Sequence, residues 1–187
     1  GDQRKYLQLA QDELTRLAET VKRMLDFYRP GKIDKEIIQI KTIIDKVISL
    51  LHPQLRDRFI QLNMNIPLNM PAFWGAADQL QQVIFNLMLN AIDALEDVKN
   101  NRTIWIEASF QDGANCLWVE DSGVGIDPEL ESQIFEPFVS TKKNGTGLGL
   151  SVSYNIMHAH GGSIRVVSGL HGHGARFEIR IPVRLEG

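Results

Sequence analysis

The stretch that decides the fold is 140-STKKNGTGLGLSVS-153, in which a polar, glycine-rich turn runs directly into an apolar pattern. Every second position from 145 to 149 is a glycine, so main-chain amides there can approach a ligand without interference from a Cβ atom. The pattern that follows predicts a helix over 148–160. The free N–H groups and the positive dipole end of such a helix favour an anion, phosphate above all.

The turn alone does not identify a phosphate site, because a flexible hinge uses glycine in the same way. It is not a P-loop, since no Gly-Lys-Ser/Thr follows the spacer, and its three glycines do not fit the dinucleotide fingerprint. Thr146 offers a hydroxyl, and Lys142 or Lys143 offers a mobile positive charge for an outer phosphate. The other motifs of the chain decide between these interpretations.

A second motif is 81-QQVIFNLMLNAIDAL-95, which belongs to a helix predicted from about 76 to 97. Asn86 and Asn90 are four residues apart and share one helix face, with Asp93 a further turn along. Their neighbours are apolar, so these carboxamides lie near a buried face. They either satisfy main-chain groups or act as neutral oxygen ligands for Mg²⁺.

A third motif, 119-VEDSGVGID-127, ends a predicted strand with Asp121 and continues through Gly123 and Gly125. A carboxylate at a strand end can accept a hydrogen bond from an exocyclic amine such as that of adenine, and glycines allow a flat ring to approach the main chain. A plain Asp-Ser-Gly turn would give the same letters. Taken alone, the motif leaves both interpretations open.

These motifs occur in a fixed order that resembles the ATP-binding catalytic domain of sensor histidine kinases, in the superfamily of gyrase B, MutL and the heat-shock chaperones. NLMLNAIDA is similar to the N box of that family, DSGVGI to the first glycine box, FEPFVSTK to the F box with the start of the lid, and GTGLGL to the second glycine box. The resemblance covers about 35–184. The tail that includes 140–153 is most similar to the nitrogen-regulation type.

The resemblance implies a role for each matching residue. It assigns Mg²⁺ binding to Asn86 and Asn90, catalysis to these two and Lys142, and adenine binding to Asp121. The superfamily members that hydrolyse ATP carry a glutamate at the position of Asn86, and asparagine cannot accept the proton of water. The residues expected to bind ATP are Asn90, Asp93, Asp121, Gly123, Gly125, Ile126, Phe138, Thr141, Lys142, Gly145, Thr146, Gly147, Leu148, Gly149 and Leu150.

Strand and helix patterns mix without strict alternation, which favours an α+β fold: a two-layer sandwich of one mixed sheet covered on one face by helices, with one long helix before it. We expect two domains, 1–30 and an ATP-binding domain over 31–187. In 1–30, apolar residues recur at spacings of three and four, as in a helical bundle or coiled coil. The resemblance makes this segment the second helix of a dimerisation hairpin; a single amphipathic helix on its own domain is the alternative.

Composition narrows the possible partners. A formal net charge of -3 without a long basic block gives no reason to expect nucleic acid or a membrane surface as partner. The single cysteine, Cys116, excludes a disulfide within the chain and favours a reducing compartment, so we expect a cytoplasmic protein. No apolar run reaches the roughly 18 to 20 residues that span a bilayer, although an intact parent with a membrane anchor fits the resemblance.

The resulting hypothesis is a fragment of a two-component sensor histidine kinase that binds ATP and Mg²⁺. Its parent would transfer the γ-phosphoryl group to a histidine and then to an aspartate of a response-regulator receiver domain, and would be a homodimer through the first helix. The alternatives are a serine kinase of the same fold and an ATP-dependent dimerisation or binding module.

The accepting histidine of the family is absent, so we expect no self-phosphorylation. His52, His158 and His160 lie outside any such motif and are interpreted as structural or solvent-facing. His171 and His173 stand in a glycine-rich turn without further metal ligands, so we expect an exposed hairpin tip rather than a metal site.

Overall fold

The computed structural model describes residue 11 and residues 34–140, 145–172 and 174–184. Apart from residue 11, the predicted N-terminal helix lies outside these residues, as do the predicted site residues Thr141 and Lys142, so the expectations attached to them stay predictions.

The described part of the chain centres on a five-stranded mixed sheet with the strand order β2-β4-β5-β7-β6. Strand β2 pairs with β4 in parallel, and all the other neighbours are antiparallel. This is the mixed sheet that the sequence predicted. The strands are β2 (Gln61–Asn65), β4 (Thr103–Gln111), β5 (Ala114–Asp121), β6 (Ser163–Val167) and β7 (Arg176–Pro182).

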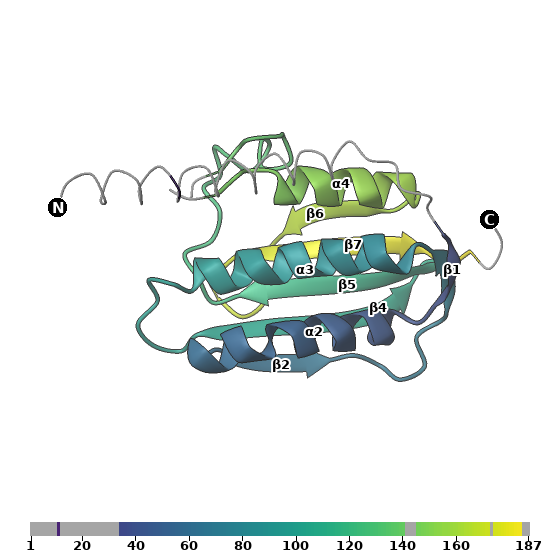
Figure 1. The fold of residues 1–187 in the computed structure, drawn as a ribbon, viewed down its shortest axis with the longest axis horizontal. Coiled ribbons are helices and arrows are strands. Elements are labelled where there is room, and N and C mark those ends of the chain that lie inside the picture. The colour runs from purple at the N-terminus through teal and green to yellow at the C-terminus, as the bar shows by residue number, and fades with distance from the viewer. Residues whose placement is uncertain (1–10, 12–33, 141–144, 173, 185–187) are drawn as a thin grey trace.

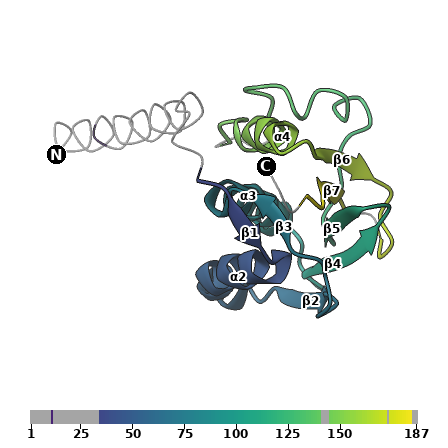
Figure 2. The same cartoon turned by 90° about the vertical axis from the view of Figure 1, so that its right-hand side faces the viewer.

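Helices α2 (Ile40–Asp57), α3 (Ala77–Ala94) and α4 (Gly149–Ala159) lie side by side over one face of this sheet, as Figure 1 and Figure 2 show. Their apolar residues recur every three or four positions, so each helix buries one face against the strands. Among the described residues, no helix has both the length and the apolar character to cross a membrane. Core residues from the helices include Ile44, Val47, Leu51, Ile84, Leu87, Met88, Ile92 and Met157.

Three local features differ from the sequence patterns. The apolar run before α2 predicts a short strand, and β1 (Glu36–Ile38) forms there, but no pattern predicted its antiparallel partner β3 (Phe73–Gly75). Helix α3 ends at Ala94 rather than near 97, where hydrogen bonds of the i to i−3 type form turns instead. Residues 129–134 carry a weak helical pattern, which predicts a short helix, but they too form successive turns.

Asp112-Gly113 between two alternating apolar runs predicts a two-residue hairpin, and the hairpin between β4 and β5 has these residues at its turn. Both residues have positive φ, 48° and 74°, as a two-residue type I′ turn requires. The turn fixes the register that places Gln111 opposite Ala114 and Ile104 opposite Asp121.

The sheet face opposite the helices carries polar and aromatic side chains, and we call it the open face. Alternation along β4, β5 and β7 sends apolar residues to the helices and sends the residues between them to the open face. Figure 2 shows no described helix on this side. The open face includes Trp105, Glu107, Trp118, Glu120, Arg176 and Glu178.

Cys116 belongs to β5 and is fully buried and free. Burial raises the pKa of its thiol and is the largest effect on it. The nearby charges act in opposite directions. Because the thiolate is the reactive form, Cys116 packs as a small apolar side chain rather than serving as a nucleophile.

His160 joins the helix layer at the end remote from the glycine-rich turn. Its Nε2 accepts a hydrogen bond from the Ala76 amide at 3.0 Å, just before α3, and its Nδ1 lies 2.8 Å from the Ile156 carbonyl oxygen. The imidazole therefore donates at one nitrogen and accepts at the other. This confirms a structural role for His160; His158 is exposed.

We predict that His160→Ala lowers the free energy of unfolding by about 1–3 kcal/mol, because the Ala76 amide loses its acceptor at a part-buried position. Urea unfolding followed by circular dichroism measures the change. His52→Ala, at an exposed position of α2, is the control and should change stability by less than about 0.5 kcal/mol. Equal effects of the two substitutions would contradict the assigned role.

Candidate nucleotide site

Three elements meet at one end of the sandwich, on the left in Figure 1. The end of α3, the end of β5 and the start of α4 all lie there, next to the long connection between β5 and α4. The three sequence motifs therefore lie at the same end of the sandwich, and specific contacts join α3 to each of the other two elements.

Asp121 ends β5 and is buried, with 4% of its surface exposed. Its Oδ1 accepts hydrogen bonds from the Gly123 amide at 2.8 Å and the Ala175 amide at 3.4 Å. The main chain of Asp121 also pairs with Ala175, its amide donating to the Ala175 carbonyl oxygen at 3.0 Å. Two segments of the chain, at Gly123 and at Ala175, therefore set the orientation of the Asp121 side chain.

Gly123 joins this turn to α3. A Cβ atom at Gly123 would lie 2.8 Å from the Ala94 carbonyl oxygen and 2.7 Å from the Asp121 carboxylate, closer than real Cβ atoms approach. Only glycine fits between the end of α3 and Asp121. This is a specific physical reason for the glycine, beyond the close approach of a ring that the sequence suggested.

Ser122, which the sequence analysis passed over, anchors the same turn to the start of β4. The Thr103 amide donates to Ser122 Oγ at 2.9 Å, and Ser122 Oγ donates to the Asn101 carbonyl oxygen at 2.8 Å. The Ser122 amide donates in turn to the Thr103 carbonyl oxygen. The only signal in the sequence was the tendency of Asp-Ser-Gly to form a turn.

Asn86 connects α3 to the start of α4. Its Nδ2 donates to the Gly149 carbonyl oxygen at 3.1 Å and lies 3.3 Å from Ser153 Oγ. A carbonyl oxygen can only accept, so the amide nitrogen of Asn86 faces α4. Neither of these two contacts involves the amide oxygen of Asn86.

The glycine-rich turn is held against the segment before it. Phe138 donates its amide to the Gly147 carbonyl oxygen at 3.0 Å, and both residues have positive φ, 68° and 67°. A Cβ atom at Gly147 would lie 2.5 Å from the Phe138 carbonyl carbon. Phe138 itself is 60% exposed, so its strained backbone is maintained by the turn rather than by burial of its ring.

The remaining predicted ligands differ in their burial. Leu148, the residue before α4, is buried, whereas Gly145 is exposed. The half-buried residues are Asn90 and Asp93 on α3, Gly125 and Ile126 after β5, and Thr146, Gly149 and Leu150 at the glycine-rich turn.

The donor atoms fit an oxygen-preferring cation better than a soft metal. No group of three or more His, Cys, Asp or Glu side chains suited to a metal occurs among the described residues. Mg²⁺ takes few protein ligands beside phosphates and waters, and an amide oxygen is one that it accepts. Asn86 and Asn90, half-buried on the same helix face, are compatible with such a site.

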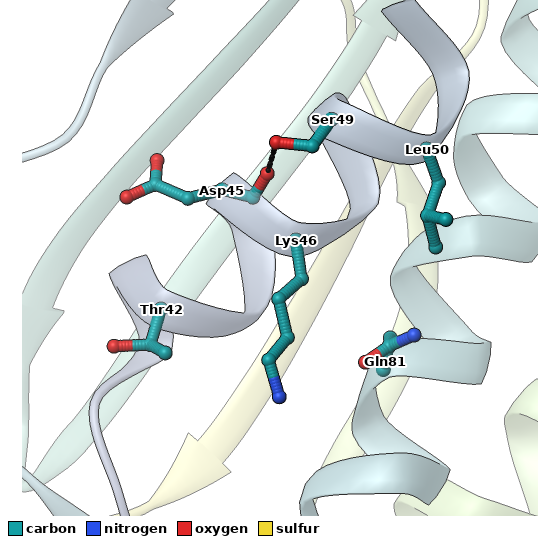
Figure 3. A pocket seen from close by; sticks show the side chains of 6 residues that line it. All are labelled: Thr42, Asp45, Lys46, Ser49, Leu50 and Gln81. Atoms are coloured by element: carbon teal, nitrogen blue, oxygen red, sulfur yellow. Dashed lines mark hydrogen bonds between the residues drawn. The ribbon is translucent and has the colours of Figure 1, made fainter.

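A hollow on the outer surface of the helix layer, shown in Figure 3, is separate from this site. There Ser49 Oγ donates to the Asp45 carbonyl oxygen at 2.8 Å. The hollow contains none of the residues predicted from the motifs. It is lined by Thr42, Asp45, Lys46, Ser49 and Leu50 of α2 and by Gln81 of α3.

Glu120, next to Asp121, has the opposite orientation and is the buried centre of a network on the open face. Its carboxylate accepts from the amides of Leu170 and His171 at 2.9 and 2.7 Å and from Arg176 Nη1 at 2.6 Å. Arg176 Nη2 also bonds Glu107 at 2.7 Å. Sequence reasoning missed this network.

His171 is exposed, as expected, and its side chain also contacts the open face. Its ring stacks on Trp105 with the centroids 4.4 Å apart and the planes at 6°, and its Nδ1 lies 3.2 Å from Glu120 Oε2. The side chain itself is 32% exposed because the loop folds back on the open face. His173 lies outside the described residues.

The pKa of Glu120 reflects this network. Burial by itself would raise the pKa, but the His171 amide, the Arg176 guanidinium and the Leu170 amide stabilise the carboxylate, and the pKa falls below its ordinary value. The folded state therefore binds this proton more weakly than the unfolded state. Glu120 stabilises the fold above the ordinary glutamate pKa of about 4.3, and this contribution is lost as the pH falls through the lower folded-state pKa.

We predict that Glu120→Gln lowers stability at pH 7 and makes it less dependent on pH between about 5 and 3 than in the native chain. Urea unfolding at several pH values measures both effects. Parallel stability profiles of the native chain and the variant would show that the Glu120 carboxylate is not the titrating group.

The comparisons with known proteins agree with this geometry. Residues 75–185 match the family model described as "Histidine kinase-, DNA gyrase B-, and HSP90-like ATPase", and the chain belongs to this family. The sensor histidine kinase ZraS of Escherichia coli O157:H7 is 35% identical over 185 residues, which cover 99% of this chain and 40% of that protein. The chain thus spans well under half the length of this relative.

Two solved structures have the same fold. Full-length ShkA in complex with AMPPNP has a TM-score of 0.79 and 26% identity, over 98% of this chain and 39% of that one. The histidine kinase ThkA in complex with the response regulator protein TrrA has a TM-score of 0.78 and 27% identity, over 96% of this chain and 51% of that one. These similarities confirm the predicted α+β fold and the resemblance to the catalytic domain of histidine kinases.

Proposed function

We propose that the chain is the ATP-binding catalytic part of a two-component sensor histidine kinase. Its parent transfers the γ-phosphoryl group of ATP to a histidine and then to a response-regulator aspartate. Family membership and the similarity to ZraS and ShkA support this proposal. The complex of ThkA with the response regulator protein TrrA supports the same type of partner here.

The observation that carries the proposal is the contact of Asn86 with Gly149, which joins the asparagine helix to the glycine-rich turn at 3.1 Å. Gly123 joins the same helix to Asp121 through close packing against Ala94. These contacts support one site in which the proposed adenine-binding carboxylate, the proposed oxygen ligands for a cation and the proposed phosphate-binding amides act together. These are the groups that a Mg²⁺-nucleotide requires.

Within this site Asp121 binds the exocyclic amine of adenine, and Gly123, Gly125 and Ile126 lie along the base. Bound Mg²⁺ would neutralise phosphate charge, held through the amide oxygens of Asn86 and Asn90. The turn that contains Gly145, Gly147 and Gly149 supplies main-chain amides to the phosphates, with the start of α4 behind it. Asp93, Phe138, Thr141, Lys142, Thr146, Leu148 and Leu150 complete the proposed set.

Asn86 favours phosphoryl transfer over hydrolysis. Its side chain is a neutral amide, and its nitrogen is used by two contacts with α4. Such a group can position a phosphate or a cation but cannot remove a proton from water. The acceptor is therefore an external group, for which a histidine of the parent is the proposed identity.

The test mixes this chain with a separately produced hairpin of the parent that carries the accepting histidine, and adds ATP labelled at the γ-phosphate. We expect acid-labile, base-stable label on the hairpin and none on the chain alone. A hairpin in which the histidine is replaced by alanine is the control. Release of inorganic phosphate without labelled hairpin would instead favour an ATP-dependent binding module.

The parent is proposed to be a cytoplasmic or membrane-anchored homodimer that pairs through its hairpin helices. Sedimentation of the parent, with and without residues 1–30, tests this assembly. A monomeric parent would contradict it.

A further inference from the structure

The loop that joins β6 to β7, described over 168–172 and 174–175, runs from the open face to the proposed adenine site. At its end, the Ala175 amide lies 3.4 Å from Asp121 Oδ1, and the Ala175 carbonyl oxygen accepts from the Asp121 amide at 3.0 Å. Gly174 is packed so closely that a Cβ atom there would lie 1.6 Å from the Asp121 carbonyl oxygen. A displacement of this loop end therefore moves groups that orient Asp121.

Glu120 holds the other part of the same loop. Its Oε1 accepts from the amides of both Leu170 and His171, and its side chain is 1% exposed. Gly169 lies against the same carboxylate, since a Cβ atom there would be 3.0 Å from Oε1. A single buried carboxylate thus satisfies two consecutive amides of the loop.

The position of Glu120 is itself fixed. Glu120 is paired with Arg176 across β5 and β7, and the Arg176 guanidinium bonds Glu120 Oε2 while it also bonds Glu107. Arg176 follows Ala175 directly in the chain. Glu120 is consequently linked to the loop at two places: it accepts from the amides of Leu170 and His171, and it bonds Arg176, the residue that follows the loop.

We infer that Glu120 is a positioning residue for adenine recognition. By holding the β6–β7 loop, it keeps the Ala175 amide against Asp121 Oδ1 and so sets the orientation of the carboxylate that binds the exocyclic amine. Glu120 itself does not touch the nucleotide, because its side chain lies on the open face. The inference rests on the proposed role of Asp121.

Base discrimination is the property that separates positioning from general stability. Calorimetric titration with ADP and with IDP, which has a carbonyl oxygen in place of the exocyclic amine, measures it. We expect the native chain to prefer ADP. Glu120→Gln should weaken ADP binding by about tenfold and should change IDP binding much less. This factor is the lower end of the loss that follows when a residue that orients a metal ligand is replaced, and Glu120 orients Asp121 in the same indirect way.

Glu178→Gln is the matched control. Glu178 is also a buried carboxylate of the open face, bonded to Trp118 Nε1 and Arg165, and neither of these partners belongs to the β6–β7 loop. We expect it to reduce stability while leaving the ADP-to-IDP preference at the native value. Should Glu120→Gln fail to fold, His171→Ala removes only one contact of Glu120 and should lower the preference by about twofold.

The outcomes are distinct. A native chain that prefers ADP, with a preference unchanged in the Glu120 and His171 variants, would overturn the inference and leave the proposed function intact. An equal loss of preference in Glu178→Gln would also overturn it, because the effect would then follow from general loosening of the sheet. A native chain without preference would overturn the role of Asp121 and this inference with it.

Discussion

Replacing Asp121 with asparagine is expected to lower the affinity for ADP by about 10- to 100-fold, the equivalent of one charge-assisted hydrogen bond. The asparagine side chain has nearly the same shape but no charge, and its amide nitrogen cannot accept a hydrogen bond from adenine. Because Asp121 is 4% exposed and also accepts from the Gly123 amide, the substitution weakens the local turn as well.

Calorimetric titration of ADP, with and without Mg²⁺, measures this effect. Asp127→Asn is the control: Asp127 is exposed, and its Oδ1 accepts a local hydrogen bond from the Glu129 amide at 3.0 Å. The Asp127→Asn variant should bind ADP with the affinity of the native chain. If Asp121→Asn also bound ADP with native affinity, the carboxylate would have no part in base recognition.

The second large effect is expected for Gly147→Ala. A Cβ atom at this residue would lie 2.5 Å from the Phe138 carbonyl carbon and 2.7 Å from the Val139 amide nitrogen, both main-chain atoms that cannot rotate away. The positive φ of 67° adds about 1–2 kcal/mol of backbone strain for a residue with a side chain. The turn must therefore move, and we expect ADP affinity to fall at least about tenfold, the factor that 1.4 kcal/mol corresponds to.

Gly113→Ala is the matched control for Gly147→Ala. Gly113 has a similar φ of 74°, but a Cβ atom there would meet nothing within 4 Å. In urea unfolding, Gly113→Ala should show the loss of stability that a side chain at positive φ causes. It should leave the affinity for ADP unchanged. If both variants bound ADP as the native chain does, the glycine-rich turn would not take part in phosphate binding.

The helices and the central hairpin could be predicted because their signals are local. Helices α2 and α3 have long amphipathic patterns, and Asp112-Gly113 is a strong signal for a two-residue turn. Strand β3 has three residues, too few to establish a period; it pairs with β1, and its Trp74 amide donates to the Arg184 carbonyl oxygen. Its existence depends on a contact between distant segments.

The residues of the candidate site could also be selected from local motifs, but the contacts between them could not. Asn86, Asp121 and the glycines stand in ordered motifs, so their residues could be selected, and the structure then brought their elements together. The contacts of Asn86 with Gly149 and of Glu120 with His171 join residues 63 and 51 positions apart. No local pattern contains such pairs, and a glutamate next to a motif aspartate gives no sign that its side chain is buried.

The pairing of Asp121 with Ala175 also constrains when the site can form. These residues are 54 positions apart, and β7 lies near the end of the described chain, inserted between β5 and β6. Sheet contacts between distant segments form slowly, since loop-closure entropy must be overcome first. During synthesis, the carboxylate of Asp121 gains its second amide donor only after residue 175 has emerged. We therefore expect competence to bind nucleotide to arise late in folding, and a chain cut before β7 to lack it.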